Sequence, residues 1–294
     1  MKVDIKGVNL NHIGILYQSR LKDATELAKS VADHIRQLGK TVWVIPSSDK
    51  IQDTEISSTD LVISVGGDGT LLSVTRDTAA WNTPILGINA GSLGFLTELD
   101  RENYKSKLVD AFNGKGWIED RSMLSTDIGG LQWNALNEIA VSRGGAARTI
   151  QINVDVDNTR MMAFQGDGLL VATATGSTAY NLAAGGPVLP PTAPYFIIKA
   201  ISAHPLSQSA LIVEPNATVE VELKGANPAV LSIDGHVDHD LVTGDRVKVS
   251  RSTHVAHFLR LRPPNYFYGA IHSILSGERH HPDFPRYLND ESID

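Results

Sequence analysis

The stretch that decides the fold is Leu61-Val62-Ile63-Ser64-Val65-Gly66-Gly67-Asp68-Gly69-Thr70. Its first half is a mostly apolar run, typical of a strand that is buried on both faces. Glycines and Asp68 follow, and residues 71–76 continue with a helical pattern. A strand that passes through glycines into a helix places backbone amides and a helix N-terminus at the carboxyl end of a sheet. This is a suitable place for a phosphate.

The segments around this stretch alternate between strand and helix patterns. Residues 12–18 and 41–45 are rich in apolar and β-branched side chains, and 84–88 is the next strand after the glycines. Apolar residues recur at helical spacing over 24–38 and again over 104–112. Alternating strands and helices of this length predict an α/β domain with a doubly wound parallel sheet, which we assign to residues 1–116.

The pattern changes after about residue 116, where the helical period fades. Short alternating runs bounded by glycine turns predict a β-rich, antiparallel, sandwich-like domain over residues 117–262. Asp234-Gly235 is a typical hairpin turn, because glycine tolerates a positive φ. The tail, 263–294, has no clear period, and we expect it to pack back on the first domain. The strands predicted in the second half are 150–156, 169–174, 219–223, 231–234 and 247–249.

Composition excludes several classes of function. The 294 residues carry a formal net charge of −7, which disfavours broad binding to nucleic acid or to an anionic membrane. The chain contains no cysteine, so disulfides, thiolate zinc sites and a cysteine nucleophile are excluded. Charges interrupt the first residues, and no run is long enough to span a bilayer, so we expect a cytoplasmic protein.

Asp68 is an unusual residue to find among phosphate-binding amides, because its charge repels an anion. An aspartate here either holds a magnesium ion or accepts a proton from an attacking hydroxyl, and both tasks belong to phosphoryl transfer. The glycines would let the backbone approach the ligand and adopt positive φ. The alternative is a plain strand-to-helix turn in which Asp68 caps the helix. Leu72 stands where a dinucleotide fingerprint requires its third glycine, and no P-loop lysine follows.

A second cluster of interest covers residues 166–180, with the sequence GDGLLVATATGSTAY, and Gly185-Gly186-Pro187 comes shortly after it. A strand is bracketed here by segments rich in small hydroxyl side chains and exposed amides. Such groups can bind a ribose or a purine edge, and Tyr180 offers a flat face with a polar tip. The alternative is a β-hairpin with serine and threonine in its turns.

The glycine segment resembles the superfamily of NAD kinases, diacylglycerol and sphingosine kinases and 6-phosphofructokinases. Residues 84–98 then resemble the NAD kinase block, whereas lipid kinases usually have Gly-Thr-Gly-Asn-Asp there. Residues 166–180 resemble the most diagnostic NAD kinase block, with Ala174 in place of the usual proline. The resemblance to bacterial-type NAD kinases extends from Ile13 to about Arg262. It implies a phosphofructokinase-like or diacylglycerol kinase-like α/β domain and a β-rich domain.

The resemblance also implies an activity: transfer of the γ-phosphoryl group of ATP to the 2′-hydroxyl of the adenosine ribose of NAD, giving NADP. Asp68 would accept the proton of that hydroxyl. Asn137-Glu138 would contact the adenosine, Asp167 would bind the nicotinamide end, and His236 would contact substrate phosphates. The phosphate-binding residues would be Gly66, Gly67, Gly69 and Thr70. The implied substrate-binding set is Gly67, Asp68, Gly69, Asn137, Glu138, Arg148, Gln165, Asp167, Thr178, Ala179, Tyr180, Asn181, Ala183 and His236.

Several points stay open. A divalent cation, Mg²⁺ or another, is implied with ATP, but no metal ligands are assigned. A zinc site at 234–240 is disfavoured because the Asp-Gly turn explains that segment and no further ligand is suitably spaced. The sequence does not decide whether the acceptor can be NADH, whether the donor can be polyphosphate, or whether the chain forms a homodimer or a homotetramer. Gln165 lies in a segment linked to the choice between NAD and NADH, but it does not decide that choice. There are two rival functions. One is a lipid or sugar kinase. The other is a dinucleotide sensor without catalysis, and the presence of Asp68 disfavours this sensor.

Overall fold

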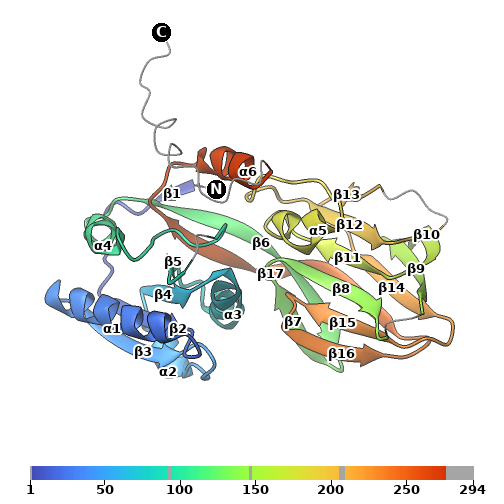
Figure 1. Cartoon of the computed structure of the whole chain (residues 1–294), viewed down its shortest axis with the longest axis horizontal. Coiled ribbons are helices and arrows are strands. Elements are labelled where there is room, and N and C mark those ends of the chain that lie inside the picture. The colour runs from blue at the N-terminus through green and yellow to red at the C-terminus, as the bar shows by residue number, and fades with distance from the viewer. Residues whose placement is uncertain (1, 92–93, 146–147, 205–208, 276–294) are drawn as a thin grey trace, which may run out of the picture.

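A computed structural model of the chain describes residues 2–91, 94–145, 148–204 and 209–275. An α/β half lies at one end of the molecule and a β-rich half at the other (Figure 1). Two long strands, β6 (Trp117–Ile128) and β17 (Arg246–Arg260), run between the halves. Among the described residues, no helix has the length and apolar character needed to cross a bilayer.

The predicted parallel sheet is confirmed in the α/β half. Its strands run parallel in the order β5-β4-β2-β3. Side chains of alternate positions enter different cores: Ile63 packs with α1 and α4 on one face, and Val62 packs with α3 on the other. Burial on both faces explains the continuous apolar run. The elements are β1 (Lys2–Asp4), β2 (His12–Tyr17), α1 (Lys22–Gln37), β3 (Thr41–Pro46), α2 (Asp53–Ile56), β4 (Leu61–Gly66), α3 (Asp68–Thr78), η1 (Ala79–Trp81), β5 (Ile85–Asn89) and α4 (Tyr104–Phe112).

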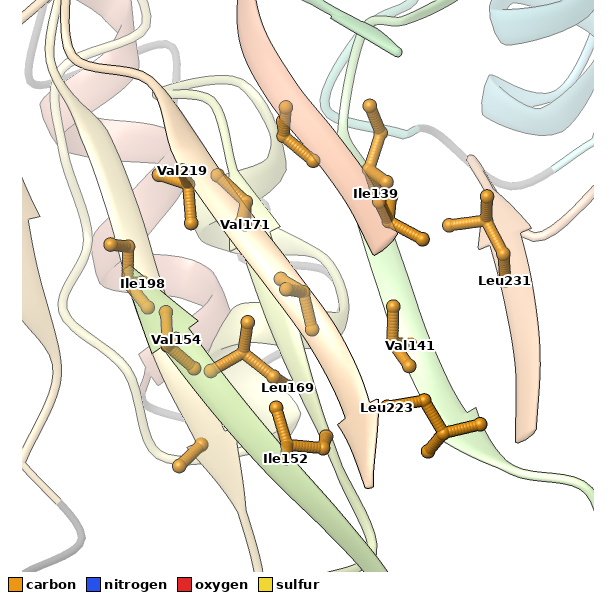
Figure 2. Packing of buried hydrophobic residues seen from close by; sticks show 14 of the residues in the cluster. Ile139, Val141, Ile152, Val154, Leu169, Val171, Ile198, Val219, Leu223 and Leu231 are labelled. Carbon is orange, nitrogen blue, oxygen red and sulfur yellow. The ribbon is translucent and has the colours of Figure 1, made fainter. Parts of the chain in front are cut away.

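The β-rich half is a sandwich of antiparallel strands, as predicted. Figure 2 shows Val141 and Leu169 from one sheet packed toward Ile152 and Val219 from the other. The second sheet has the order β13-β12-β11-β8-β15-β16. The remaining elements are β7 (Leu131–Ala135), β8 (Glu138–Arg143), β9 (Ile150–Val156), β10 (Thr159–Gly166), β11 (Gly168–Ala172), η2 (Gly176–Thr178), α5 (Tyr180–Ala183), β12 (Phe196–Ile201), β13 (Leu211–Val213), β14 (Val219–Lys224), β15 (Ala229–Ile233) and β16 (Val237–Leu241).

Strand β17 belongs to both halves. Val249 pairs with Val219 of β14, while Phe258 pairs in parallel with Ile85 of β5. One sheet therefore continues from β10 of the sandwich to β3 of the α/β half. The predicted strand at 247–249 was too short. The register shifts between Arg251 and Val255, and such an irregularity breaks the period-two pattern from which a strand is recognised.

The chain continues after β17 into α6 (Tyr266–Leu275). Trp117 Nε1 donates a hydrogen bond of 3.0 Å to the Arg262 carbonyl, and the Arg262 guanidinium lies 4.4 Å from the centre of the Tyr266 ring. Tyr266 and Phe267 line a small cavity with Phe95. Residues 276–294 of the predicted tail lie outside the described part of the chain.

Candidate active site

The glycine segment lies where β4 ends and α3 begins, at the carboxyl edge of the parallel sheet. Asp68 Oδ2 accepts the amide of Phe95 at 2.8 Å, and Oδ1 accepts the amide of Leu96 at 3.1 Å. Among the described residues, the carboxylate accepts these two loop amides and no amide of its own helix, which disfavours the alternative of a plain capped turn. Instead, the loop after β5 holds the Asp68 carboxylate. Ser92 and Leu93 of that loop lie outside the described residues.

The glycines have separate tasks. A Cβ on Gly66 would lie 2.4 Å from Thr70 Oγ1, and a Cβ on Gly94 would lie 2.2 Å from Asp68 Oδ1. Gly67 and Gly69 face open space. The predicted positive φ is wrong for Gly66, Gly67 and Gly69. Close packing against Thr70 requires glycine at Gly66, whereas a Cβ on Gly67 or Gly69 would meet no described atom within 4 Å.

Asn137 and Glu138 stand at the start of β8, where Asp234 fixes them. Asp234 Oδ1 accepts the amides of Asn137 at 2.7 Å and Glu138 at 3.2 Å, and Oδ2 accepts that of Leu136 at 2.9 Å. The Asp234-Gly235 turn has positive φ at both residues, 49° and 65°, as predicted for a hairpin. Burial raises the pKa of Asp234, although the three amides and Arg76 oppose the shift. Sequence reasoning identified Asp234 only as a turn residue.

Glu138 is buried, and its carboxylate does not have all of its hydrogen bonds within the described residues. Its side chain is 8% exposed, and Oε2 has no hydrogen-bond partner among the described residues. Burial and then the charge of Asp234 raise the pKa of Glu138 to about 7, while the Tyr180 amide lowers it. An unsatisfied buried carboxylate oxygen is costly in a protein, and it is available to a hydroxyl donor.

The second cluster packs directly on this pair. The Thr173 hydroxyl donates to the Leu136 carbonyl at 2.6 Å, and a Cβ on Gly176 would lie 2.2 Å from the Asn137 carbonyl. Asn181 is completely buried, and its side-chain Nδ2 donates to the carbonyls of Ser177 at 2.9 Å and Pro187 at 2.8 Å. These bonds hold the turn between η2 and the Gly-Gly-Pro segment. The Asn181 Nδ2 group therefore stabilises the loop.

Asp167 and Tyr180 line one pocket of about 390 Å³ together with Arg143. Arg143 Nε lies 2.9 Å from Asp167 Oδ1, and Tyr180 is 41% exposed. The ring, the carboxylate and the guanidinium therefore face the same open space. The pocket has room for a ring-sized group.

Other predicted residues lie near this pocket or apart from it. Gln165 is exposed on β10 and donates to Thr149 Oγ1 at 2.6 Å, and Arg148 is exposed; neither lines the pocket of Asp167 and Tyr180. His236 is exposed, and its Nδ1 lies 2.9 Å from the carbonyl oxygen of Asp234, whose side chain accepts the Asn137 amide. Thr178 and Ala179 are half-buried on the turn into α5, and Ala183 is exposed at the end of that helix.

Arg121 is the functional candidate that sequence reasoning missed. It is 6% exposed on β6, and its Nη1 donates to Thr175 Oγ1 at 3.4 Å. Burial lowers its pKa to about 10, while the charges of Glu119 and Asp68 act in the opposite direction. Arg121 therefore lies between the glycine segment and the 173–180 loop. One arginine within a strand gives no sequence signal for such a position.

The site thus joins a glycine loop at the edge of a parallel sheet to a sandwich that presents a buried acid, hydroxyl groups and an exposed tyrosine. This arrangement fits one class of protein, a phosphotransferase that acts on a nucleotide-like acceptor.

Comparison with known proteins agrees with this class. The family description "ATP-NAD kinase N-terminal domain" matches residues 15–116, and "ATP-NAD kinase C-terminal domain" matches residues 136–261. The NAD kinase of Chloroflexus aurantiacus is 35% identical over 265 residues, which is 88% of this chain and 96% of that protein. The NAD kinase of Dehalococcoides mccartyi is 35% identical over 273 residues, or 90% and 96%.

Two solved structures share the fold. An NAD kinase from Archaeoglobus fulgidus in complex with ATP has a TM-score of 0.75 and 26% identity, covering 90% of this chain and 99% of that chain. Yeast NADH kinase complexed with NADH has a TM-score of 0.80 and 20% identity, covering 94% and 90%. The chain belongs to the ATP-NAD kinase family. The prediction of an ATP-dependent NAD kinase is confirmed, and the lipid or sugar kinase alternative is not supported.

Proposed function

We propose that this enzyme forms NADP by transferring the γ-phosphoryl group of ATP to the 2′-hydroxyl of the adenosine ribose of NAD, with Asp68 as the base. The observation that carries the proposal is the pair of unlike carboxylates on the two halves. Asp68 is held by two backbone amides, and Glu138 keeps one buried oxygen that no group in the described part of the chain satisfies. One carboxylate suits proton transfer, and the other suits recognition of a sugar.

Asp68 can act as a base because each of its oxygens keeps a lone pair after accepting one amide. The two amides fix the plane of the carboxylate, so the proton acceptor is oriented before the substrate binds. General-base catalysis of this kind contributes about 10²–10⁴-fold in rate. Positioning and charge stabilisation supply the rest of the acceleration in phosphoryl transfer.

The phosphates would bind at the N-terminus of α3. Gly67 and Gly69 leave the backbone accessible there, Gly66 lets the Thr70 side chain pack closely, and the helix dipole favours negative charge. Arg121 adds a fixed positive charge beside Asp68. The described residues hold no group of three acidic or imidazole side chains that would bind a metal by itself. This suits a Mg²⁺ ion held chiefly by ATP phosphates, with Asp68 as the neighbouring carboxylate, and such an ion would neutralise phosphate charge.

Glu138 would accept hydroxyls of the adenosine ribose, and the Asn137 side chain would bind alongside. Thr178, Ala179, Tyr180, Asn181 and Ala183 belong to the loop around the adenosine, with Tyr180 supplying a flat surface. Asp167 would contact the nicotinamide end in the pocket it shares with Tyr180. His236 and Arg148 are proposed phosphate contacts, and Gln165 is proposed to lie near the dinucleotide. We expect a cytoplasmic homo-oligomer that contacts neither nucleic acid nor membrane; NADH and polyphosphate remain candidate substrates.

One assay tests the proposal. Purified protein is incubated with NAD, ATP and Mg²⁺, and the product is measured with an NADP-specific dehydrogenase. The expected result is NADP formation that depends on all three components. Binding of NAD without NADP formation would overturn the proposed reaction and favour the sensor alternative.

A further inference from the structure

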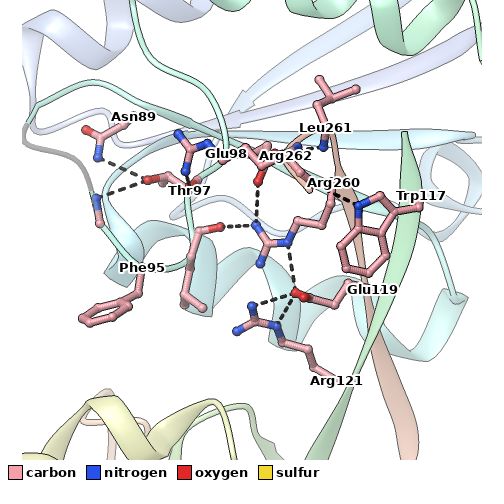
Figure 3. Close-up of polar contacts among 12 residues, drawn as sticks. Asn89, Phe95, Thr97, Glu98, Trp117, Glu119, Arg121, Arg260, Leu261 and Arg262 are labelled. Carbon is pink, nitrogen blue, oxygen red and sulfur yellow. Dashed lines mark hydrogen bonds and ion pairs between the residues drawn. The ribbon is translucent and has the colours of Figure 1, made fainter. Parts of the chain in front are cut away.

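Four charged side chains, from the loop after β5 and from β6 and β17, form a buried cluster (Figure 3). Glu98, Glu119, Arg121 and Arg260 are each less than 10% exposed. Arg260 Nε lies 3.0 Å from Glu119 Oε1, and Arg121 Nη2 lies 2.7 Å from the same oxygen. Arg260 Nη1 lies 3.3 Å from Glu98 Oε2. The cluster links the loop after β5 to β6 and β17, which are distant in sequence.

Arg260 is connected to the proposed base, Asp68, through a single intervening residue, Leu96. Its Nη1 donates to the Leu96 carbonyl at 2.9 Å, and the amide of the same Leu96 donates to Asp68 Oδ1. Glu98 strengthens this attachment, because its Oε1 accepts the amides of Leu261 at 2.8 Å and Arg262 at 2.6 Å. The end of β17 thus holds the loop at two points.

The loop needs such support because its described residues before Leu99 belong to no helix or strand. Asn89 Nδ2 contacts Thr97 Oγ1 at 3.3 Å, and the Glu98 amide donates to the Gly87 carbonyl at 2.9 Å. These bonds attach the loop to β5 but do not reach Leu96. The carbonyl of Leu96 is held by Arg260.

The same cluster extends to the acceptor half. Glu119 lies between Arg260 and Arg121, and Arg121 donates to Thr175 Oγ1 at 3.4 Å. Thr175 precedes Gly176, which packs on Asn137. One chain of contacts therefore runs from Asp68 through Leu96 and the arginines to the residues beside the proposed adenosine pocket.

Stability alone does not account for this cluster. Burying ion pairs is expensive, and well-packed apolar residues in their place are often as stable or more so. Arg260 Nη2 is buried without a partner among the described residues, which adds to the cost. Burial raises the pKa of Glu119, but Arg121 and Arg260 more than compensate and lower it, so the carboxylate stays ionised at neutral pH. The arrangement fixes geometry at an energetic cost.

We propose that Arg260 is a positioning residue for phosphoryl transfer. Its guanidinium holds the Leu96 carbonyl, and thereby the two amides that orient the Asp68 carboxylate relative to Thr175 and the acceptor pocket. The proposal rests on the proposed role of Asp68 as the base. Lysine cannot replace this group, because a single ammonium does not reproduce the planar fork that reaches Leu96, Glu98 and Glu119 together.

The test compares Arg260→Lys and Arg260→Met with Arg246→Met. Arg246 lies at the opposite end of the same strand, where it also pairs with two glutamates, Glu220 and Glu222 of β14 in the sandwich. For Arg260→Lys we expect kcat to fall about 10–100-fold, as for a base displaced by a fraction of an ångström, with KM for NAD within about twofold. The Met variant should lose at least as much, and Arg246→Met should stay within about twofold of the parent in kcat. Titration calorimetry measures how many NAD molecules bind per chain, and a value of one verifies that a variant is folded.

A double variant separates positioning from general weakening. If Arg260 acts through Asp68, Asp68→Asn/Arg260→Lys should have the kcat of Asp68→Asn within about twofold, because residues that act as a unit are not additive. Independent multiplication of the two losses, or an unchanged kcat in Arg260→Lys, would overturn the proposal. If the Arg260 variants bind less than one NAD per chain, Glu119→Gln, which loosens the same guanidinium, is measured with the same expectations. Parental protein that makes no NADP would instead reject the proposed function.

Discussion

The two carboxylates of the site are prepared in opposite ways. Asp68, in the α/β half, has both oxygens engaged by backbone amides. Glu138, in the sandwich, keeps a buried oxygen with no partner among the described residues, and its pKa is raised to about 7. The nearby acid Asp234 accepts the backbone amides of Leu136, Asn137 and Glu138, and its charge contributes to the raised pKa of Glu138.

This difference separates two tasks. A base needs a fixed direction in the absence of substrate, and hydrogen bonds to the backbone supply it. A recognition group gains most when its hydrogen-bonding capacity is unmet before the substrate arrives, because the ligand then relieves an existing cost. Changing Asp68 should therefore lower kcat, whereas changing Glu138 should raise KM for NAD.

The largest effect is expected from Asp68→Asn. The amide side chain keeps the size of the carboxylate but cannot accept the proton of the hydroxyl, so kcat should fall about 10²–10⁴-fold. KM for NAD should change by less than about threefold, because the binding groups lie in the other half. Steady-state kinetics with NAD and ATP measure both constants. A variant with near-normal kcat would show that Asp68 is not the base.

Gly94→Ala tests the orientation of Asp68 without altering it chemically. The new Cβ would lie 2.2 Å from Asp68 Oδ1, so the carboxylate must move. We expect kcat to fall about 10²-fold, the usual cost of a catalytic group displaced by about 1 Å. Gly91→Ala is the matched control, since its Cβ would meet only Asn89 Oδ1 at an ordinary 3.9 Å. Equal losses in both variants would refute the steric explanation.

Glu138→Gln should act on binding instead. The neutral amide loses the charged acceptor, and hydrogen bonds to a charged group are worth about 1.5–3 kcal/mol, so KM for NAD should rise about 10–100-fold. We expect kcat to stay within about threefold when NAD is saturating. Glu222→Gln is the control, because Glu222 is also largely buried but is paired with Lys224 and Arg246, away from the site. A loss confined to kcat would contradict the assignment of Glu138 to recognition.

The smallest effect is expected from pH. The ionised carboxylate is the form that accepts ribose hydroxyls, and with a pKa near 7 its population rises steeply between pH 6 and 8. The Kd for NAD should therefore fall about tenfold over that range. Titration calorimetry at several pH values measures it, and Glu138→Gln should remove the dependence. If Kd changes with pH equally in the Glu138→Gln variant, the pH dependence belongs to another titratable group.

The same shift has a consequence for stability. Because the pKa of Glu138 is raised on folding, the folded protein binds more protons than the unfolded chain between about pH 4.5 and 7. The stability from this carboxyl group is thus fully present below the unfolded pKa and is lost as pH rises through the folded pKa. Thermal unfolding of the free protein at pH 5 and pH 8 should show this decline, and Glu138→Gln should lessen it.

Much of the fold could be predicted from periodicity. Helices α1, α3 and α4 and the four parallel strands appear within a few residues of their predicted bounds, because buried helix faces repeat at helical spacing and burial on both faces of a strand leaves apolar runs such as 61–65. The short elements β1 and α2 were not predicted. The full length of β17 could not be predicted. Its irregular register hides the alternation, and its pairing with Ile85 of β5 is a contact between residues far apart in sequence.

The site was predicted in part. The local composition of the Gly66–Thr70 segment indicates phosphate binding, and that of residues 166–180 indicates binding of a ribose or a purine. Asp234, Arg121 and Arg260 gave no such signal, because an Asp-Gly dipeptide indicates a turn and single arginines in strands are common. Their importance comes from three-dimensional contacts: Asp234 with the backbone at Asn137, and Arg260 with Leu96.

The sequence by itself determined the α/β and β-rich halves and the glycine loop that carries Asp68. These depend on side-chain period and local backbone chemistry, to which neighbouring residues contribute. The type of substrate followed from the resemblance of residues 84–98 and 166–180 to NAD kinases. Only the tertiary structure decided which amides hold Asp68, which Glu138 oxygen lacks a partner within the described ranges, and how the two halves are joined. Those properties depend on burial and on contacts between distant segments, and hydrogen-bond satisfaction has no local pattern.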